Sequence, residues 1–201
     1  MPHTLVHFVR HGQVHNPHEK YYGRLPGFRL SGEGLCQARA AAKTLSRYPI
    51  AAVYSSPLER AIETADEILN RFDGLDLRIS ELLSEAYTPF DGQPLRVVAG
   101  RNWDVYTGTD HPYEQPSDVV ERVKKFVANV RREFPGRQVV ATTHADVIAF
   151  MMLWSRGEPV TAQHKHGLYE DYMGYASITS FVFETDSEDE IPGFRYSVPY
   201  G

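Results

Sequence analysis

The chain of 201 residues is 42% hydrophobic and 23% charged, a balance typical of a globular protein with a sizeable core. Its formal net charge of −5 argues against a broad nucleic-acid surface, and its apolar runs are too short to cross a bilayer. The single cysteine, Cys36, excludes a disulfide framework and a cysteine-based metal cage. We expect one domain over residues 1–201, a cytoplasmic location, and neither a nucleic-acid nor a membrane partner. The oligomeric state stays open, with a homodimer among the alternatives.

The first predicted element is a short buried strand over residues 5–9, which ends in Arg10, His11 and Gly12. Open α/β sheets bind ligands at the carboxyl ends of their strands, and Gly12 lets the backbone turn tightly and approach a ligand. Arginine carries a fixed fork of donors that suits phosphate, and histidine acts as a nucleophile or proton carrier near neutral pH. This junction therefore predicts an anion site with a reactive imidazole.

A polar loop and a helix are predicted next. The loop covers residues 15–30. The helix has Ser31 as its N-cap and runs to about Tyr48, where Pro49 stops it. A second buried strand covers residues 50–54.

The following helix has a marked start. Ser56 is predicted as its N-cap, Pro57 as its first helical residue, and Glu59 as the partner in a capping box. Apolar residues at helical spacing continue this helix to Leu69, and a short strand over residues 77–79 follows it.

Residues 82–116 mix aromatic residues with glycine and proline without a clear period, which is typical of a lid or specificity segment. The remaining predicted elements are a helix over residues 117–134, a strand over 138–142, a helix over 145–154, and two late strands over 178–183 and 194–198 with an acidic, solvated turn at 184–190 between them. Strands that alternate with helices predict an α/β three-layer sandwich, with a mostly parallel central sheet and helices on both faces.

Three of the predicted strand-to-helix junctions carry residues that could do chemistry. Arg10 and His11 follow the first strand, Arg60 lies in the first turn of the helix after the second, and His144 follows the strand over residues 138–142. Parallel strands place such junctions at one edge of the sheet, where two helix N-termini would also aim backbone N–H groups. Two histidines and two arginines brought together in this way suit a dianionic phosphoryl group.

The chain also carries an ordered set of motifs from Val6 to the helix after His144. They are Arg10-His11-Gly12 with Asn16, Leu30-Ser31-x-x-Gly34-x-x-Gln37-Ala38, Ser55-Ser56-Pro57-Leu58-x-Arg60-Ala61-x-x-Thr64-Ala65, Glu85, and His144 before an apolar helix. This set resembles the histidine phosphatase superfamily, the phosphoglycerate-mutase-like group, and the Ser-Ser-Pro-Leu-x-Arg-Ala block is its most specific member.

The resemblance implies a phosphatase-type member of this group, with the corresponding phosphoglycerate-mutase-like fold. Such an enzyme would hydrolyse a phosphomonoester of a small metabolite through a phosphohistidine, as a metal-independent histidine acid-type phosphatase without a cofactor. His11 would attack phosphorus. Arg10, Arg60 and His144 would hold the phosphoryl oxygens, and Glu85 would protonate the leaving oxygen.

The resemblance also points to Asn16 as a phosphate contact, for which a turn residue is the plain alternative. Glu81 is the rival of Glu85 for the proton donor. The chain departs from the family where Gln13-Val14 replaces Glu-Thr and where Ala145-Asp146 replaces Gly-Gly; we expect the Asp146 side chain to point away from the phosphate. The Gly-Gly-Glu-Ser pattern before the later helix is absent, which leaves substrate selection open.

Two other functions remain open at this point. A cofactor-dependent phosphoglycerate mutase is the alternative within the family, and a non-catalytic phosphate-binding protein is the alternative from another class. Mutases of the family resemble somewhat longer chains with extra segments that trap a bisphosphate intermediate, so this compact chain favours a phosphatase over the mutase. An acid opposite a nucleophile has no use in a pure binding protein, which disfavours the other alternative.

Some residues have plainer explanations. The histidines at every fourth position from His3 to His15 suggest metal ligands only on a helix, which the strand and Gly12 disfavour. The cluster at residues 164–166 is better explained as a solvated loop than as a contact site. Three aromatic residues of the lid segment are either packing residues or walls of a leaving-group pocket: Tyr87, Phe90 and Trp103.

Overall fold

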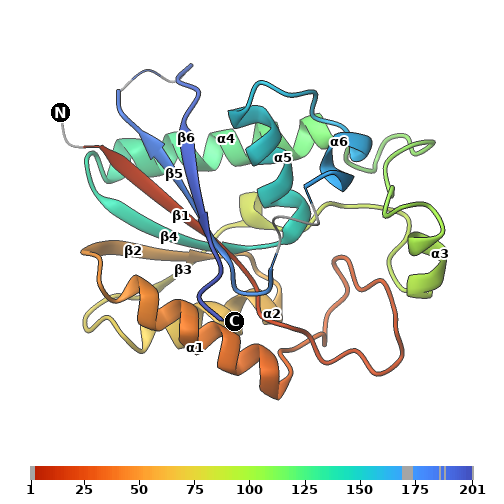
Figure 1. Ribbon diagram of the computed structural model, residues 1–201, viewed down its shortest axis with the longest axis horizontal. Helices are drawn as coiled ribbons and strands as arrows, with labels where there is room; N and C mark the ends of the chain where they lie inside the picture. The colour runs from red at the N-terminus through yellow and green to blue at the C-terminus, as the bar shows by residue number, and fades with distance from the viewer. Residues whose placement is uncertain (1–2, 169–173, 186, 188, 201) are drawn as a thin grey trace.

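The computed structural model describes residues 3–168, 174–185, 187 and 189–200. Within these residues a six-stranded sheet has the order β3-β2-β4-β1-β5-β6 (Figure 1). Its strands are β1 (Thr4–Arg10), β2 (Ile50–Ser55), β3 (Leu77–Ile79), β4 (Gln138–Thr143), β5 (Ile178–Phe183) and β6 (Gly193–Ser197). Among the described residues, no helix is both long and apolar enough to span a membrane.

Most of the sheet is parallel. Strand β4 pairs in parallel with both β1 and β2, and β2 pairs in parallel with β3. Strand β5 runs antiparallel to β1, and β6 runs antiparallel to β5. The prediction of a mostly parallel α/β sheet is confirmed, and the antiparallel hairpin of β5 and β6 extends it at one edge. The central strands are apolar along their length because helices cover both of their faces.

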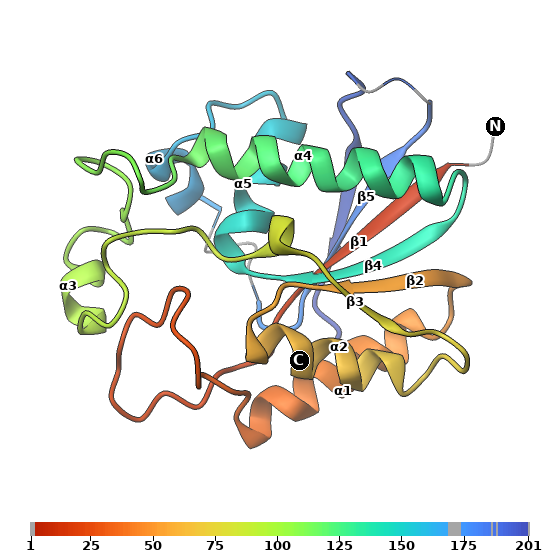
Figure 2. The same ribbon diagram turned by 180° about the vertical axis from the view of Figure 1, so that it is seen from behind.

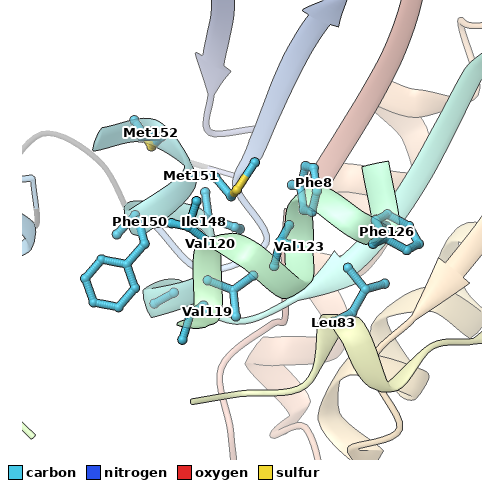
Figure 3. Packing of buried hydrophobic residues seen from close by; sticks show 14 of the residues in the cluster. Phe8, Leu83, Val119, Val120, Val123, Phe126, Ile148, Phe150, Met151 and Met152 are labelled. Atoms are coloured by element: carbon cyan, nitrogen blue, oxygen red, sulfur yellow. The ribbon is translucent and has the colours of Figure 1, made fainter. Parts of the chain in front are cut away.

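Helices α1 (Gly32–Leu45) and α2 (Glu59–Leu69) cover one face of the sheet. Helices α4 (Pro116–Glu133) and α5 (Ala145–Ser155) cover the opposite face, and the short helix α6 (Ala162–His166) lies beside α5 (Figures 1 and 2). Each face has its own cluster of buried apolar side chains. In the larger cluster, Phe8 of β1 contacts Phe126 of α4 edge to face, with 6.2 Å between ring centroids (Figure 3).

Helix starts show where the local sequence pattern worked and where it did not. Ser31 caps α1 as predicted, because its Oγ accepts the Gly34 N–H at 3.0 Å. Helix α2 begins at Glu59 after Leu58, so the predicted capping box with Ser56 is wrong. The Glu59 carboxylate instead accepts the backbone N–H of Gly27. The predicted start of α4 at Ser117 is displaced slightly, to Pro116.

The predicted lid segment begins within a 3-10 turn, η1 (Glu81–Leu83), and contains the short helix α3 (Leu95–Ala99). Its apolar residues Val98, Val105 and Tyr106 are buried in the larger core cluster. The solvated loop expected at residues 164–166 is wrong, because these residues end α6 and Lys165 is only 1% exposed. The expected acidic turn at residues 184–190 lies partly outside the described residues, at 186 and 188.

Candidate active site

The carboxyl end of β1 fixes the first histidine. The His11 backbone N–H donates to the Thr143 carbonyl of β4, and the His11 ring Nδ1 lies 2.8 Å from the Gly12 carbonyl oxygen. A carbonyl only accepts, so in the neutral ring Nδ1 carries the proton and Nε2 keeps its lone pair. A Cβ on Gly12 would stand 2.4 Å from the Gly34 carbonyl oxygen, so the turn after His11 packs too closely for any other residue.

The second histidine lies at the end of the neighbouring strand. His144 is the residue between β4 and α5, and its side chain is fully buried. Its Nε2 lies 2.8 Å from the Ser56 hydroxyl, and its Nδ1 lies 3.1 Å from Arg60 Nη2. Arginine only donates, so Nδ1 accepts and the Nε2 proton goes to Ser56. Ser56 therefore holds the His144 ring by this hydrogen bond, a role that the prediction of a helix cap missed.

The two imidazole rings are neighbours, with 5.3 Å between their centroids. Burial, followed by the charges of Arg60 and Arg10, holds the pKa of His11 well below its usual range. Burial and Arg60 have the same effect on the pKa of His144. Both rings are therefore neutral at pH 7, and a neutral imidazole is the form that acts as a nucleophile.

Two arginines flank this pair. Arg60 is fully buried, its Nη2 donates to the Gly23 carbonyl at 2.7 Å, and its guanidinium lies 4.7 Å from the ring centroid of Tyr22. Its Nε has no hydrogen-bond partner among the described residues. The guanidinium of Arg10 lies 4.1 Å from the ring centroid of Tyr175. The stacked aromatic rings hold each planar guanidinium in place without neutralising its charge.

Glu85 lies two residues after η1 and faces His144. One carboxylate oxygen lies 3.9 Å from His144 Nδ1, and the other accepts the Ala86 N–H at 2.9 Å. Burial, and then the charge of Asp146, raise the pKa of Glu85 from 4.5 to about 7. The carboxyl can therefore be protonated at neutral pH, as a proton donor requires. Its rival Glu81 is exposed.

An ion-pair cluster clamps the backbone on either side of Glu85. Glu114 pairs with Arg24 at 2.8 Å and with Arg122 at 2.6 Å, and it also accepts the Tyr87 N–H at 2.9 Å. The same two arginines donate to backbone carbonyls of the acid segment, Arg24 to that of Glu85 itself at 2.6 Å and Arg122 to that of Leu82 at 2.7 Å. Three charged side chains from distant parts of the chain thus fix the loop that carries Glu85.

These groups surround a cavity of about 540 Å³, lined in part by Arg10, His11 and Glu85. Arg60 and His144 are fully buried directly against them. The structure therefore brings together the five residues predicted to be catalytic. Asn16 also lines the cavity, but its side chain makes two hydrogen bonds to the Lys20 backbone, which is a turn contact.

Several lining residues differ from expectation. Asp146 does not point away: it is 6% exposed, lines the cavity, and bonds to Tyr106 and Lys165. Gln13, where the family usually has glutamate, accepts a bond from the Ser31 hydroxyl at 2.8 Å. Of the three aromatic residues proposed as walls, Trp103 alone is among the lining residues.

Sequence reasoning assigned Lys165 to a solvated loop and gave no role to the aromatic rings of Tyr22 and Tyr175. No local pattern marks them, because their partners are distant in the chain.

The described residues contain no group of three or more His, Cys, Asp or Glu side chains arranged to hold a metal ion. His7, one of the histidines that recur at every fourth position, contacts Ser180 and Gln138 on the sheet with its ring nitrogens.

An α/β sheet of this order, with helices on both faces, is the phosphoglycerate-mutase-like fold. The chain matches the model of the histidine phosphatase superfamily (branch 1) over residues 6–189, and it belongs to this superfamily. It is 35% identical over 190 residues to the protein Rv0525 of Mycobacterium tuberculosis, covering 91% of this chain and 92% of the relative. It is 28% identical to the phosphatase PhoE of Bacillus subtilis, covering 78% of this chain and 80% of the relative.

Solved structures agree with this assignment. The mycobacterial glucosyl-3-phosphoglycerate phosphatase Rv2419c superimposes with a TM-score of 0.79 at 27% identity, covering 98% of each chain. YhfR of Bacillus stearothermophilus superimposes with a TM-score of 0.78 at 23% identity, covering 97% of this chain and 96% of the other, which shows the shared fold. Membership of the superfamily and the likeness to the Rv2419c phosphatase at 27% identity support a phosphatase.

Proposed function

We propose that this protein hydrolyses phosphomonoesters of a small metabolite through a phosphohistidine on His11, as a cytoplasmic phosphatase that needs no metal ion. One observation carries the proposal: His11 and His144 are both neutral and lie 5.3 Å apart, with two arginines and a carboxyl of raised pKa around them. Each of these groups has a distinct part in phosphoryl transfer.

In the first step His11 Nε2 attacks phosphorus, the N–P bond forms, and the bond between phosphorus and the leaving oxygen breaks. The protonated Glu85 gives its proton to that oxygen, so the alcohol leaves uncharged. In the second step the Glu85 carboxylate takes a proton from water while the water oxygen attacks phosphorus. Phosphate then leaves, and the neutral imidazole and the protonated carboxyl are restored.

The arginines serve the charge that spreads over the phosphoryl oxygens in the transition state. Arg10 lies at the surface of the cavity, and Arg60 offers a buried Nε donor without a partner among the described residues. When Arg60 turns its donors to a phosphoryl group, the ring proton of His144 can shift from Nε2 to Nδ1. The Ser56 hydroxyl then donates to Nε2, and Nδ1 donates to a phosphoryl oxygen. These side-chain cations supply the positive charge that a metal ion supplies in other phosphatases, so activity should survive treatment with a chelator.

The size of the substrate follows from the cavity. About 540 Å³ accommodates a small metabolite and its phosphoryl group but not a folded partner. The mycobacterial neighbour at 27% identity is a phosphatase of glucosyl-3-phosphoglycerate, which is also a small molecule. We carry over only this size class.

The proposal is tested with the wild type, His11→Ala and His15→Ala. His15 is exposed and lies outside the cavity, so His15→Ala controls for loss of a nearby imidazole. Wild type and His15→Ala should turn over p-nitrophenyl phosphate and form an acid-labile phosphoprotein, whereas His11→Ala should do neither.

Three results would contradict the proposal. A phosphoprotein that persists in His11→Ala would assign the nucleophile elsewhere. Transfer between 2- and 3-phosphoglycerate that is faster than hydrolysis, and that bisphosphoglycerate stimulates, would identify a mutase. Absence of turnover above the His11→Ala background would leave a phosphate-binding protein.

A further inference from the structure

The cavity contains an ion pair that the proposed chemistry does not use. Asp146, in the first turn of α5, lines the cavity two residues beyond His144. Its Oδ2 lies 2.7 Å from Lys165 Nζ, and it also accepts the Tyr106 hydroxyl. Lys165 is 1% exposed, and its Nζ also donates to the Trp103 carbonyl at 3.1 Å. Buried charge-assisted bonds of this kind hold a side chain in one position.

We propose that Asp146 is a specificity-determining residue, and that its carboxylate makes the cavity reject esters whose leaving group is an anion. The inference rests on the proposed phosphatase function and names its substrate class: phosphomonoesters of uncharged, hydroxyl-bearing alcohols.

The distribution of charge in the cavity carries this proposal. The lining includes five charged or titratable side chains of Asp, Glu, Lys and Arg: Arg10, Glu19, Glu85, Asp146 and Lys165. Arg10 lies next to the nucleophile in the chain and serves the phosphoryl group. Lys165 is the remaining cation of that set, and its ammonium is already paired with Asp146 and bound to a backbone carbonyl. A carboxylate or second phosphate on the leaving group would therefore meet negative charge, with no further Lys or Arg among the described lining residues to compensate it.

The field of Asp146 reaches the reacting groups. Its charge is the second-largest cause, after burial, of the raised pKa of Glu85, which is the group that touches the leaving oxygen. An anion attached to that oxygen would lie in the same field. The effect is strong because both carboxyl groups are buried, and charges interact more strongly away from water.

The rest of the lining suits a neutral polyol or sugar. Trp103 and Leu95 offer an apolar wall, while Asp146 and Glu19 offer acceptors for hydroxyl groups. Lys165 holds the Trp103 backbone, which has a φ of 60°, so one buried cation fixes both the acceptor and the wall. Strained backbone of this kind concentrates at ligand sites.

A matched pair of esters tests the charge filter directly. Glycerol 3-phosphate and 3-phosphoglycerate share a carbon skeleton and differ in a hydroxymethyl group in place of a carboxylate. The wild type should have a kcat/KM for glycerol 3-phosphate at least about tenfold above that for 3-phosphoglycerate, since like charges in a site cost at least this much. Where turnover of either ester is too slow to follow, the ratio of the two inhibition constants against p-nitrophenyl phosphate measures the discrimination in binding instead.

Asp146→Asn keeps the shape of the side chain, removes its charge, and leaves the Lys165 ammonium able to pair with a substrate carboxylate. We expect this variant to shift the ratio at least about tenfold toward 3-phosphoglycerate. Any change in Glu85 acts on both esters and cancels in the ratio. Asp104→Asn is the matched control, because Asp104 follows Trp103 but bonds to the backbone of residues 106 and 107 and does not line the cavity. It should leave the ratio unchanged.

An unchanged ratio in Asp146→Asn, or a wild type that prefers 3-phosphoglycerate, would overturn the inference. Turnover of p-nitrophenyl phosphate separates this failure from a failure of the proposed function. If the wild type hydrolyses that ester but the ratio does not move, the charge filter alone is wrong; if it hydrolyses none of the three, both proposals fall.

Discussion

Replacing Glu85 by glutamine should stabilise the folded protein at alkaline pH. Burial first, and the charge of Asp146 next, raise the pKa of Glu85 from 4.5 to about 7. Between these two values the unfolded chain has lost a proton that the folded chain keeps, so the free energy of unfolding falls as the pH rises. The difference between about 7 and 4.5, at about 1.4 kcal/mol per pH unit, amounts to about 3 kcal/mol. Glutamine cannot ionise, so the variant escapes this cost.

The test is urea unfolding of the wild type and Glu85→Gln, followed by tryptophan fluorescence at two pH values. The variant should be more stable by about 1 kcal/mol at about pH 5 and by about 3 kcal/mol at about pH 8.5. Glu81→Gln is the control, because Glu81 is exposed and lies four residues earlier. Its effect should stay within about 0.5 kcal/mol at both pH values. A Glu85→Gln difference that does not change with pH would refute the raised pKa, and with it the assignment of Glu85 as a neutral acid.

Turnover of alkyl phosphates should fall as the pH rises through about 7, because Glu85 loses its proton there. Turnover of p-nitrophenyl phosphate should stay level, because its leaving group needs no proton. Parallel pH profiles for the two esters would show that Glu85 is not the proton donor. Glu114→Gln loosens the ion pairs that hold the Glu85 segment, so it should slow turnover of alkyl phosphates more than turnover of p-nitrophenyl phosphate. The control Glu190→Gln breaks an equally buried pair with Arg131 and should slow neither ester selectively. An equal loss of turnover on both esters in Glu114→Gln would mean that Glu114 has a purely structural role. Gly12→Ala should lower the unfolding midpoint steeply, because the added Cβ would stand 2.4 Å from the Gly34 carbonyl oxygen. The control Gly32→Ala should leave the midpoint nearly unchanged, because a Cβ there has no atom within 4 Å. Equal midpoints for the two variants would contradict the close packing of the turn after His11.

The meeting of His11, Arg60 and His144 could be predicted from sequence because it depends on topology. Periodicity locates the central strands, parallel pairing places their carboxyl ends at one edge, and each of these residues follows such an end closely. No side-chain detail is needed for that inference, and the distance of 5.3 Å between the two imidazole rings confirms it.

Residues whose partners come from elsewhere in the fold could not be predicted in this way. Ser56 matches the pattern of a helix cap, but its hydroxyl lies 2.8 Å from His144, 88 residues away. Lys165 stands between two histidines and looks solvated, yet Asp146 and the Trp103 carbonyl bury it. Local patterns describe how a residue fits its own helix or loop, and a charged side chain is assigned to the surface unless its counter-charge lies nearby in the chain.

The pair of Asp146 and Lys165 also links two properties of the site: the acid strength of Glu85 and the selection against a charged leaving group. The charge of Asp146 raises the pKa of Glu85, and that of Lys165 lowers it. If the same charges filter the leaving group, each substitution must move both properties together. Asp146→Asn should lower the pH at which alkyl phosphate turnover declines and should admit anionic leaving groups. Lys165→Met should raise that pH and exclude anions more strongly. If either variant moved only one of the two properties, acid strength and substrate charge would have separate origins in this cavity.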